Sequence, residues 1–230
     1  MVAPTFASLC NDAESVGLVC RGGFHPDPQD FVPACADGSR AATVVLFGFV
    51  GSRGWPTFAA SAERADGRPD ALDRWSQRVI DAIGARTGAI GLYPSHGPPW
   101  LPFQRWALRA ESLHFSPLGI LIHPDFGLWH AYRGALAFQT RLALPEPVQR
   151  PSPCSTCIAR PCLSACPVAA FQPDQFDRRA CAGHVAATEG ADCLQRGCRA
   201  RRSCPVGADH RYAADQANFH MAAFLRGSVL

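Results

Sequence analysis

The sequence predicts an α+β domain that is followed by a small cysteine-rich domain. Three observations support this division. Strand-like apolar runs alternate with segments of helical periodicity up to about Phe138, a proline-rich stretch follows, and eight of the eleven cysteines lie beyond it, between Cys154 and Cys204. We therefore expect a first domain over residues 1–143 and a second over 144–230.

The strands and helices of the first domain can be read from its apolar pattern. The continuous apolar and β-branched run Ala42–Phe49 is typical of a buried strand. A helix is predicted to begin behind Pro69 with Asp70 as its N-cap and to end near Ala85. Its apolar residues recur at helical spacing: Leu72, Trp75, Val79, Ile80 and Ile83.

A second group of elements completes the first domain. Residues 89–93 read as a strand, and residues 102–112 read as a helix with proline in its first turn. The runs 119–124 and 128–138 read as two strands, and the residues between them, 125–127, predict a hairpin. Strands interleaved with helices make the first domain α+β or α/β, and we take α+β as the predicted class.

The sequence around the cysteines predicts less regular structure. Four prolines between Ala143 and Ser155 indicate a stiff linker, which we expect from Leu144 to Ser155. Apolar residues between Ala213 and Leu225 return at helical spacing and end before Gly227, so a last helix is expected there.

Composition excludes several functions. All 22 basic residues are arginine, so lysine-dependent chemistry such as a Schiff base or a lysine P-loop is excluded. A formal net charge of +3 is too small to indicate nucleic-acid binding by itself. The first residues do not form a signal peptide, and no segment approaches the roughly 18 apolar residues of a membrane span. We expect a cytoplasmic protein without a membrane partner.

The cysteines form two groups, each closed by a Cys-Pro pair. The first group has the spacing C-x2-C-x4-C-x3-C-P, and bacterial two-cluster ferredoxins have C-x2-C-x2-C-x3-C-P. The second group is looser and ends at Cys204-Pro205. In a reducing compartment such cysteines indicate metal or redox chemistry rather than disulfides. The remaining three, Cys10, Cys20 and Cys35, are expected to be buried free thiols.

Ferredoxin spacing predicts two [4Fe–4S] clusters with crossed ligation, in which the fourth cysteine of each group binds the other cluster. Structural zinc is the alternative, but Cys-Pro closing both groups favours iron and sulfur. The arginines around the second group could raise a cluster's potential, dock an acidic donor or RNA phosphates, or form a solvated basic face. The crossed rule assigns one cluster to Cys154, Cys157, Cys162 and Cys204, and the other to Cys166, Cys181, Cys193 and Cys198.

Residues 119–138, GILIHPDFGLWHAYRGALAF, resemble the G-x-x-IHP-x-FG-x-W-x-x-x-RG stretch of cobalamin-processing CblC-type proteins. Residues 99–112 are similar to the helix of that family whose glutamine binds the corrin, which places this role on Gln104. The resemblance implies a nitroreductase-like fold and a corrin pocket, with Arg133 holding an anion or the departing ligand. It implies cofactor-binding positions at Gln104, Gly119, His123, Phe126, Trp129 and Arg133.

Three of these positions also have simpler interpretations. His123 could ligate cobalt. A histidine at a strand end whose ring is hydrogen-bonded within the protein is favoured, because a lone histidine is seldom a ligand. Phe126 and Trp129 could be core aromatics or could stack on the corrin.

The cysteine-rich half resembles a different family. Its two groups, together with FDRRACAGHV at 176–185, are similar to the two-cluster tail of epoxyqueuosine reductase, another cobalamin enzyme with a nitroreductase-like core. That family carries an acid ahead of its helix and a G-W-I-G-K segment after it. Here Pro98 and Pro99 precede the helix and His114, Phe115 and Ser116 follow it, so the acid and the lysine are missing.

The leading hypothesis is therefore an oxidoreductase that binds cobalamin and reductively removes its upper axial ligand, by dealkylation or decyanation. Its electrons would come through the [4Fe–4S] clusters from a donor such as a reductase, a flavodoxin or a thiol. The alternatives are a tRNA-modifying reductase of the epoxyqueuosine type and a ferredoxin-type electron carrier without a corrinoid. Nucleic acid is a partner only in the second of these three hypotheses.

Overall fold

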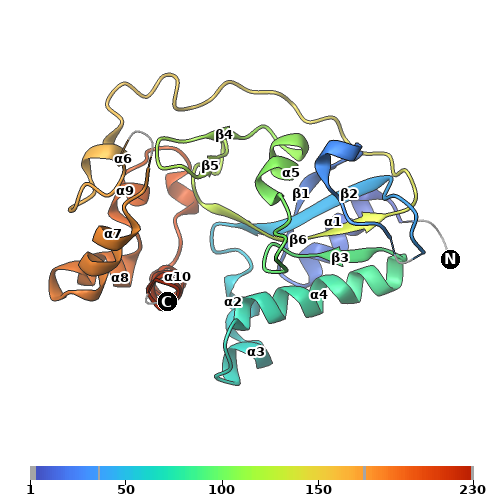
Figure 1. Ribbon diagram of the computed structural model, residues 1–230, viewed down its shortest axis with the longest axis horizontal. Helices are drawn as coiled ribbons and strands as arrows, with labels where there is room; N and C mark the ends of the chain where they lie inside the picture. Colours follow the sequence, from blue (N-terminus) through green and yellow to red (C-terminus); the bar gives the residue numbers. More distant parts are fainter. Residues whose placement is uncertain (1–3, 36, 173–174, 229–230) are drawn as a thin grey trace. The chain divides into compact units, whose positions relative to one another are not determined.

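The computed structural model describes residues 4–35, 37–172 and 175–228, and it confirms the α+β class (Figure 1). The chain forms two compact units. The first contains Met1–Ser112 and Ala131–Gln149, and the second contains Leu113–His130 and Arg150–Leu230. This division differs from the expected single boundary at residue 143, because the segment 113–130 belongs to the same unit as the clustered cysteines.

A four-stranded sheet forms the centre of the first unit, in the order β1 (Val19–Phe24), β2 (Thr43–Val50), β6 (His130–Phe138) and β3 (Ile90–Leu92). Strand β1 pairs antiparallel with β2, and β3 pairs antiparallel with β6. Every residue of β2 is buried, as the uninterrupted apolar run predicts for a strand covered on both faces.

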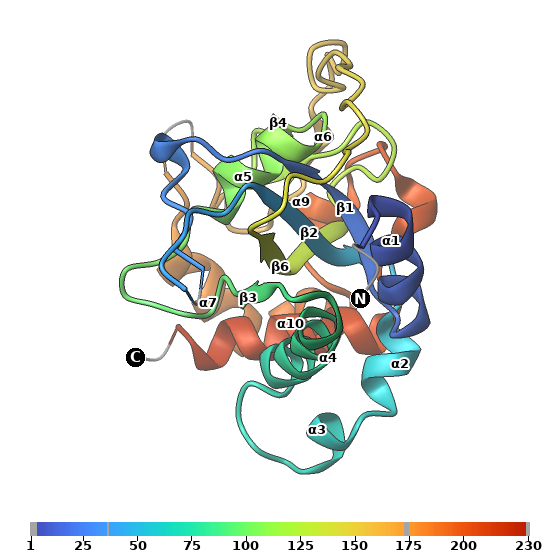
Figure 2. The ribbon, with the colours of Figure 1, turned by 90° about the vertical axis from the view of Figure 1, so that its right-hand side faces the viewer.

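Helices cover both faces of this sheet. Helix α5 (Phe103–Ala110) packs on β1 and β2, and α4 (Ala71–Thr87) packs on β3. Figures 1 and 2 show these two helices on opposite sides of the sheet. Helix α1 (Phe6–Ser15) packs on β1 and on α4. The short elements of this unit are η1 (Pro28–Asp30), α2 (Trp55–Ala59) and α3 (Ala62–Ala65).

The second unit consists of short helices and one small sheet. Strands β4 (His114–Phe115) and β5 (Leu121–Ile122) pair antiparallel. Helix α10 (Ala214–Arg226) packs against α7 (Arg178–Ala186) and α8 (Ala191–Arg196), and α6 (Pro161–Ser164) packs against α9 (Arg199–Arg202). Two single turns, η2 (Thr188–Gly190) and η3 (Ala208–His210), connect these helices.

Most predicted elements are present, with two corrections. The runs 119–124 and 128–138 do not pair as a hairpin. A turn closed by a bridge between His123 and Gly127 separates them, while β5 pairs with β4 and β6 joins the large sheet. Asp70 precedes α4 as predicted, but its backbone is left-handed (φ 54°) and its side chain makes no capping hydrogen bond. Residues 144–152 contain no helix or strand, as expected of the linker.

All eleven cysteines lie in the described part of the chain and have free thiols. Cys35 is buried, as predicted, whereas Cys10 and Cys20 are only half-buried. Within the described residues, no helix has both the length and the apolar character that crossing a membrane requires.

Candidate iron–sulfur site

The second unit gathers the eight clustered cysteines into two sets of four. In the first set, burial raises the pKa of the Cys162 thiol, and the nearby thiols of Cys204, Cys154 and Cys157 raise it further. The pKa of Cys154 is raised by burial and then by Cys204 and Cys157. These four cysteines are thus electrostatic neighbours, although Cys204 is 42 or more residues from the other three in sequence. We call Cys154, Cys157, Cys162 and Cys204 set 1.

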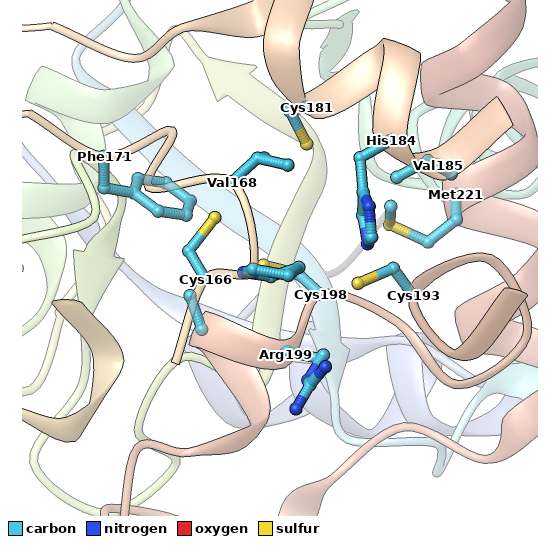
Figure 3. Close-up of a pocket in the computed structure, with 12 residues that line it drawn as sticks. Cys166, Val168, Phe171, Cys181, His184, Val185, Cys193, Cys198, Arg199 and Met221 are labelled. Atoms are coloured by element: carbon cyan, nitrogen blue, oxygen red, sulfur yellow. The ribbon is translucent and has the colours of Figure 1, made fainter. Parts of the chain in front are cut away.

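The other four cysteines line a cavity (Figure 3). Burial raises the pKa of Cys181 to about 11, and the neighbouring thiols of Cys198, Cys166 and Cys193 contribute to the rise. Among the described residues, no group of three or more His, Cys, Asp or Glu side chains could hold a metal ion as placed. We call Cys166, Cys181, Cys193 and Cys198 set 2.

Short helices and their ends place the thiols of set 2. Cys181 lies in the first turns of α7, whose N-cap Asp177 accepts a hydrogen bond from the Ala180 N–H at 2.8 Å. Cys193 lies in α8, which ends at Gly197 with φ 85°, a value that favours glycine. The chain turns there, so that Cys198 becomes the N-cap of α9.

Backbone N–H groups point at several of these sulfurs. The Ala170 N–H donates to Cys166 Sγ at 3.3 Å. Burial raises the pKa of Cys198, while N–H groups of Arg201 and Ala200 at the start of α9 act in the opposite direction. Such donors stabilise a thiolate, the form in which cysteine binds metal. These N–H groups therefore offset part of the rise in thiol pKa that burial causes.

The two sets share one apolar wall. Cys162 and Cys204 of set 1 are buried in a cluster with Leu118, Ile122 and Leu128 from the β4–β5 segment and Ala200 from α9. Cys154 of set 1 and both Cys166 and Cys198 of set 2 pack against the same cluster. This contact explains why residues 113–130 belong to the second unit.

Two glycines let the chain pass close to set 1. A Cβ on Gly127 (φ 57°) would lie 1.9 Å from the Val206 carbonyl oxygen, and a Cβ on Gly207 (φ 67°) would lie 2.3 Å from the Phe126 carbonyl carbon. The turn at 124–127 therefore packs backbone to backbone on the Cys204-Pro205-Val206 segment. Cys204 is thereby held against the apolar wall.

Most arginines near the second cysteine group have internal partners. Arg201 donates to the Leu128 carbonyl oxygen and lies 4.5 Å from the ring centroids of both Trp129 and Tyr212. Arg202 forms an ion pair with Asp192 and donates to the Gly197 carbonyl. The remaining contacts involve Arg178, which donates to Gly227 and Ser228 at the end of α10, and Arg196 and Arg199, which lie within ion-pair distance of Asp192.

Four predicted corrin-binding residues lie in the second unit, and three of them, His123, Phe126 and Trp129, contact protein groups. His123 Nδ1 accepts hydrogen bonds from the N–H groups of Asp125 and Phe126 at 3.0 and 3.2 Å, and its ring stacks on Phe126. The Phe126 ring also contacts His210, and Trp129 is 3% exposed beside Arg201. These contacts agree with the simpler interpretation, in which His123 is hydrogen-bonded within the protein and Phe126 and Trp129 are core aromatics.

The other candidates are placed differently. Gln104 is exposed in the first turn of α5 in the first unit. Arg133 on β6 forms an ion pair with Asp73 and donates to Ser76 Oγ at 3.1 Å, so protein groups from α4 engage its guanidinium. Gly119 is exposed between β4 and β5. Thus neither unit contains all six predicted corrin-binding residues.

A buried polar network in the first unit was missed by the sequence analysis. Arg21 on β1 is fully buried and forms two hydrogen bonds with the Glu111 carboxylate, at 2.9 and 2.6 Å. The Tyr132 hydroxyl donates to the same carboxylate, and burial is the main reason that the pKa of Tyr132 is raised. The network links β1, the end of α5 and β6.

The fold is similar to that of a solved epoxyqueuosine reductase. One is a crystal structure of epoxyqueuosine reductase with an epoxyqueuosine-modified tRNA-Tyr stem loop, with a TM-score of 0.50 and 14% identity, covering 92% of this chain and 69% of that chain. Another, a selenomethionine-labelled epoxyqueuosine reductase, has a TM-score of 0.47 and 16% identity, covering 94% of this chain and 63% of that chain. Neither a protein-family model nor a curated protein sequence matches the chain. The first of these structures thus supports the epoxyqueuosine reductase resemblance at the level of fold, and the comparisons give no support for a CblC-type protein.

Proposed function

We propose that this chain is an iron–sulfur oxidoreductase whose second unit holds two [4Fe–4S] clusters, one in set 1 and one in set 2. The single observation that carries the proposal is the grouping of eight thiols into two sets of four across two sequence groups. When bound, such clusters supply one-electron transfer. The chain's own residues provide the thiolate ligands, the N–H donors and the apolar surroundings.

The surroundings favour clusters over structural zinc. A zinc ion needs four ligands at about 2.0–2.3 Å from a single point. Set 2 instead lines a cavity, and backbone N–H groups are directed at its sulfurs. Hydrogen bonds to sulfur and an apolar wall are the features by which proteins tune iron–sulfur clusters.

The shared wall supports electron transfer between the two sets. Both sets pack on one small apolar cluster, so no folded domain separates them. A groove of about 620 Å³ opens beside Cys154, lined among others by Phe115, Arg160 and Leu163. Set 1 is thus the set that an external donor, such as a reductase, a flavodoxin or a thiol, would reach.

For the reaction, we propose reduction of a modified nucleoside in tRNA, as in the epoxyqueuosine reductases whose fold this chain shares. This class replaces cobalamin processing as the leading hypothesis. The comparisons give no support for a CblC-type protein, and Arg133, which was to hold an anion, is paired with Asp73. Because this chain lacks the acid and the lysine of the epoxyqueuosine reductase family, its proton donor must be a different group.

Metal analysis and substrate binding test the two parts of this proposal separately. Anaerobically purified protein should contain about eight iron and about eight acid-labile sulfide per chain, with visible absorbance that bleaches on reduction. Zinc without sulfide would contradict the cluster assignment. The reduced protein should bind an epoxyqueuosine-containing tRNA stem loop and convert its nucleoside. Failure there, with a shift of added cobalamin to its base-off spectrum, would instead favour cobalamin processing.

A further inference from the structure

His184 lies in the wall of the set 2 cavity. It follows Cys181 by three residues on α7, and residues three apart share one face of a helix. Both side chains line the cavity. Figure 3 shows the His184 imidazole reaching into the space flanked by Cys181 and Cys193.

The backbone around His184 is held firmly. The next residue, Val185, is 2% exposed, and the Ala187 N–H donates to the His184 carbonyl at 3.1 Å. A Cβ on Gly190 would lie 1.8 Å from that carbonyl oxygen, so the chain after α7 returns directly against it. The imidazole is therefore carried by a fixed segment rather than by a loose loop.

The surroundings of the ring offer it no obvious protein partner. Across residues 4–35, 37–172 and 175–228, no side-chain hydrogen bond or ion pair involves His184. Apart from the thiols and Arg199, the cavity lining is apolar, and the Arg199 guanidinium points away from the sulfurs in Figure 3. The His184 side chain is half-buried, and on the cavity side its ring N–H can be satisfied only by an acceptor inside the cavity. The sulfurs of a bound cluster would be that acceptor.

We propose that the His184 ring N–H donates a hydrogen bond to a sulfur of the cluster held by set 2 and thereby raises the reduction potential of that cluster. The inference rests on the proposed function, because it requires the cluster. Reduction adds an electron to an anionic group, so a donor to sulfur stabilises the reduced state more than the oxidised one. His184 is a positioning and tuning residue in this proposal, and the cluster keeps its four cysteine ligands.

Three variants test the proposal in the full chain with both clusters. His184→Phe removes the donor but keeps an aromatic ring, His184→Gln keeps an N–H donor, and Met221→Leu alters the same wall without removing a donor. The readout is a redox titration monitored by electron paramagnetic resonance at one pH, with iron and sulfide measured for each protein. The cluster of set 1 serves as an internal reference.

We expect His184→Phe to lower the equilibrium constant for reducing the set 2 cluster about tenfold, which is about 59 mV for a one-electron couple. The other cluster should not shift, and His184→Gln and Met221→Leu should stay close to the unaltered chain. An unchanged potential in His184→Phe, with iron content intact, would overturn the proposal. So would loss of half the iron from His184→Phe, because His184 would then act in ligation or assembly. Absence of iron and sulfide from the unaltered chain would overturn the proposed function itself.

Discussion

Replacing Glu111 with glutamine tests the buried network of the first unit. Arg21 has no exposed side-chain surface and Glu111 has 15%, so the substitution leaves a buried guanidinium without its counter-charge. Breaking a buried ion pair in this way costs about 3–5 kcal/mol. We expect about 3 kcal/mol, because this side chain keeps some contact with water and the glutamine amide still offers one oxygen to Arg21 or Tyr132. In a chain of this size that loss lowers Tm by about 6–12 °C.

Glu63→Gln is the matched control for this experiment. Glu63 also forms two hydrogen bonds with an arginine, but the Arg78 side chain is 57% exposed. Ion pairs with an exposed partner contribute about 0–1 kcal/mol to the free energy of unfolding, so the Tm of Glu63→Gln should fall by less than about 4 °C. Thermal unfolding followed by circular dichroism measures both variants against the unaltered chain. A Glu111→Gln shift no larger than that of Glu63→Gln would refute the reasoning.

Acid stability and close backbone packing provide two more predictions. The hydrogen bond from Arg78 holds the pKa of Glu63 below its ordinary value of 4.5, so its contribution to stability is present above that pH and is lost as pH falls through the lower folded value. The Tm difference between the unaltered chain and Glu63→Gln should therefore shrink on acidification, and a difference independent of pH would contradict this. Gly127→Ala should reduce the iron content, because its Cβ would lie 1.9 Å from the Val206 carbonyl oxygen. Gly119→Ala is the control: φ is 73° but no atom lies within 4 Å, so only about 1 kcal/mol of backbone strain is expected, and equal iron loss in both variants would count against the packing argument.

The sequence predicted those elements whose apolar pattern decides their structure. The periodic residues of α4 and the uninterrupted run of β2 are buried as expected. Strand β1 could not be found in this way, because VCRGGF contains a charged residue and two glycines. Its arginine, Arg21, is buried only because a glutamate 90 residues away pairs with it, and such long-range pairing leaves no local signal.

The hairpin prediction failed for a related physical reason. The turn at 123–127 does exist, but Leu118, Ile122 and Leu128 pack against Cys162 and Cys204, not against the large sheet. Strand β5 therefore stays with the cysteines, and the chain enters the sheet only at His130. The apolar pattern of 119–138 shows that these residues are buried, but it does not show which core they join.

For the candidate site, cysteine spacing was the informative signal. It predicted which four thiols would be neighbours, including the distant pairing of Cys204 with the first group. His184 was missed, although its position three residues after the predicted ligand Cys181 indicates that it could lie on the same face of a helix as that cysteine. The partners of Arg133 were not predictable, because Asp73 and Ser76 reach it from a different element.

The central claim is the crossed assignment of eight cysteines to two clusters, and paired alanine substitutions test it most directly. Cys162→Ala with Cys204→Ala removes two ligands from set 1 alone, whereas Cys162→Ala with Cys166→Ala removes one ligand from each set. Iron and sulfide per chain are measured for both double variants after anaerobic purification. The account predicts that the first variant keeps about half of the iron and sulfide, as one [4Fe–4S] cluster, and that the second loses both clusters. The reverse result, with one cluster kept when Cys162 and Cys166 are replaced and none when Cys162 and Cys204 are replaced, would contradict it.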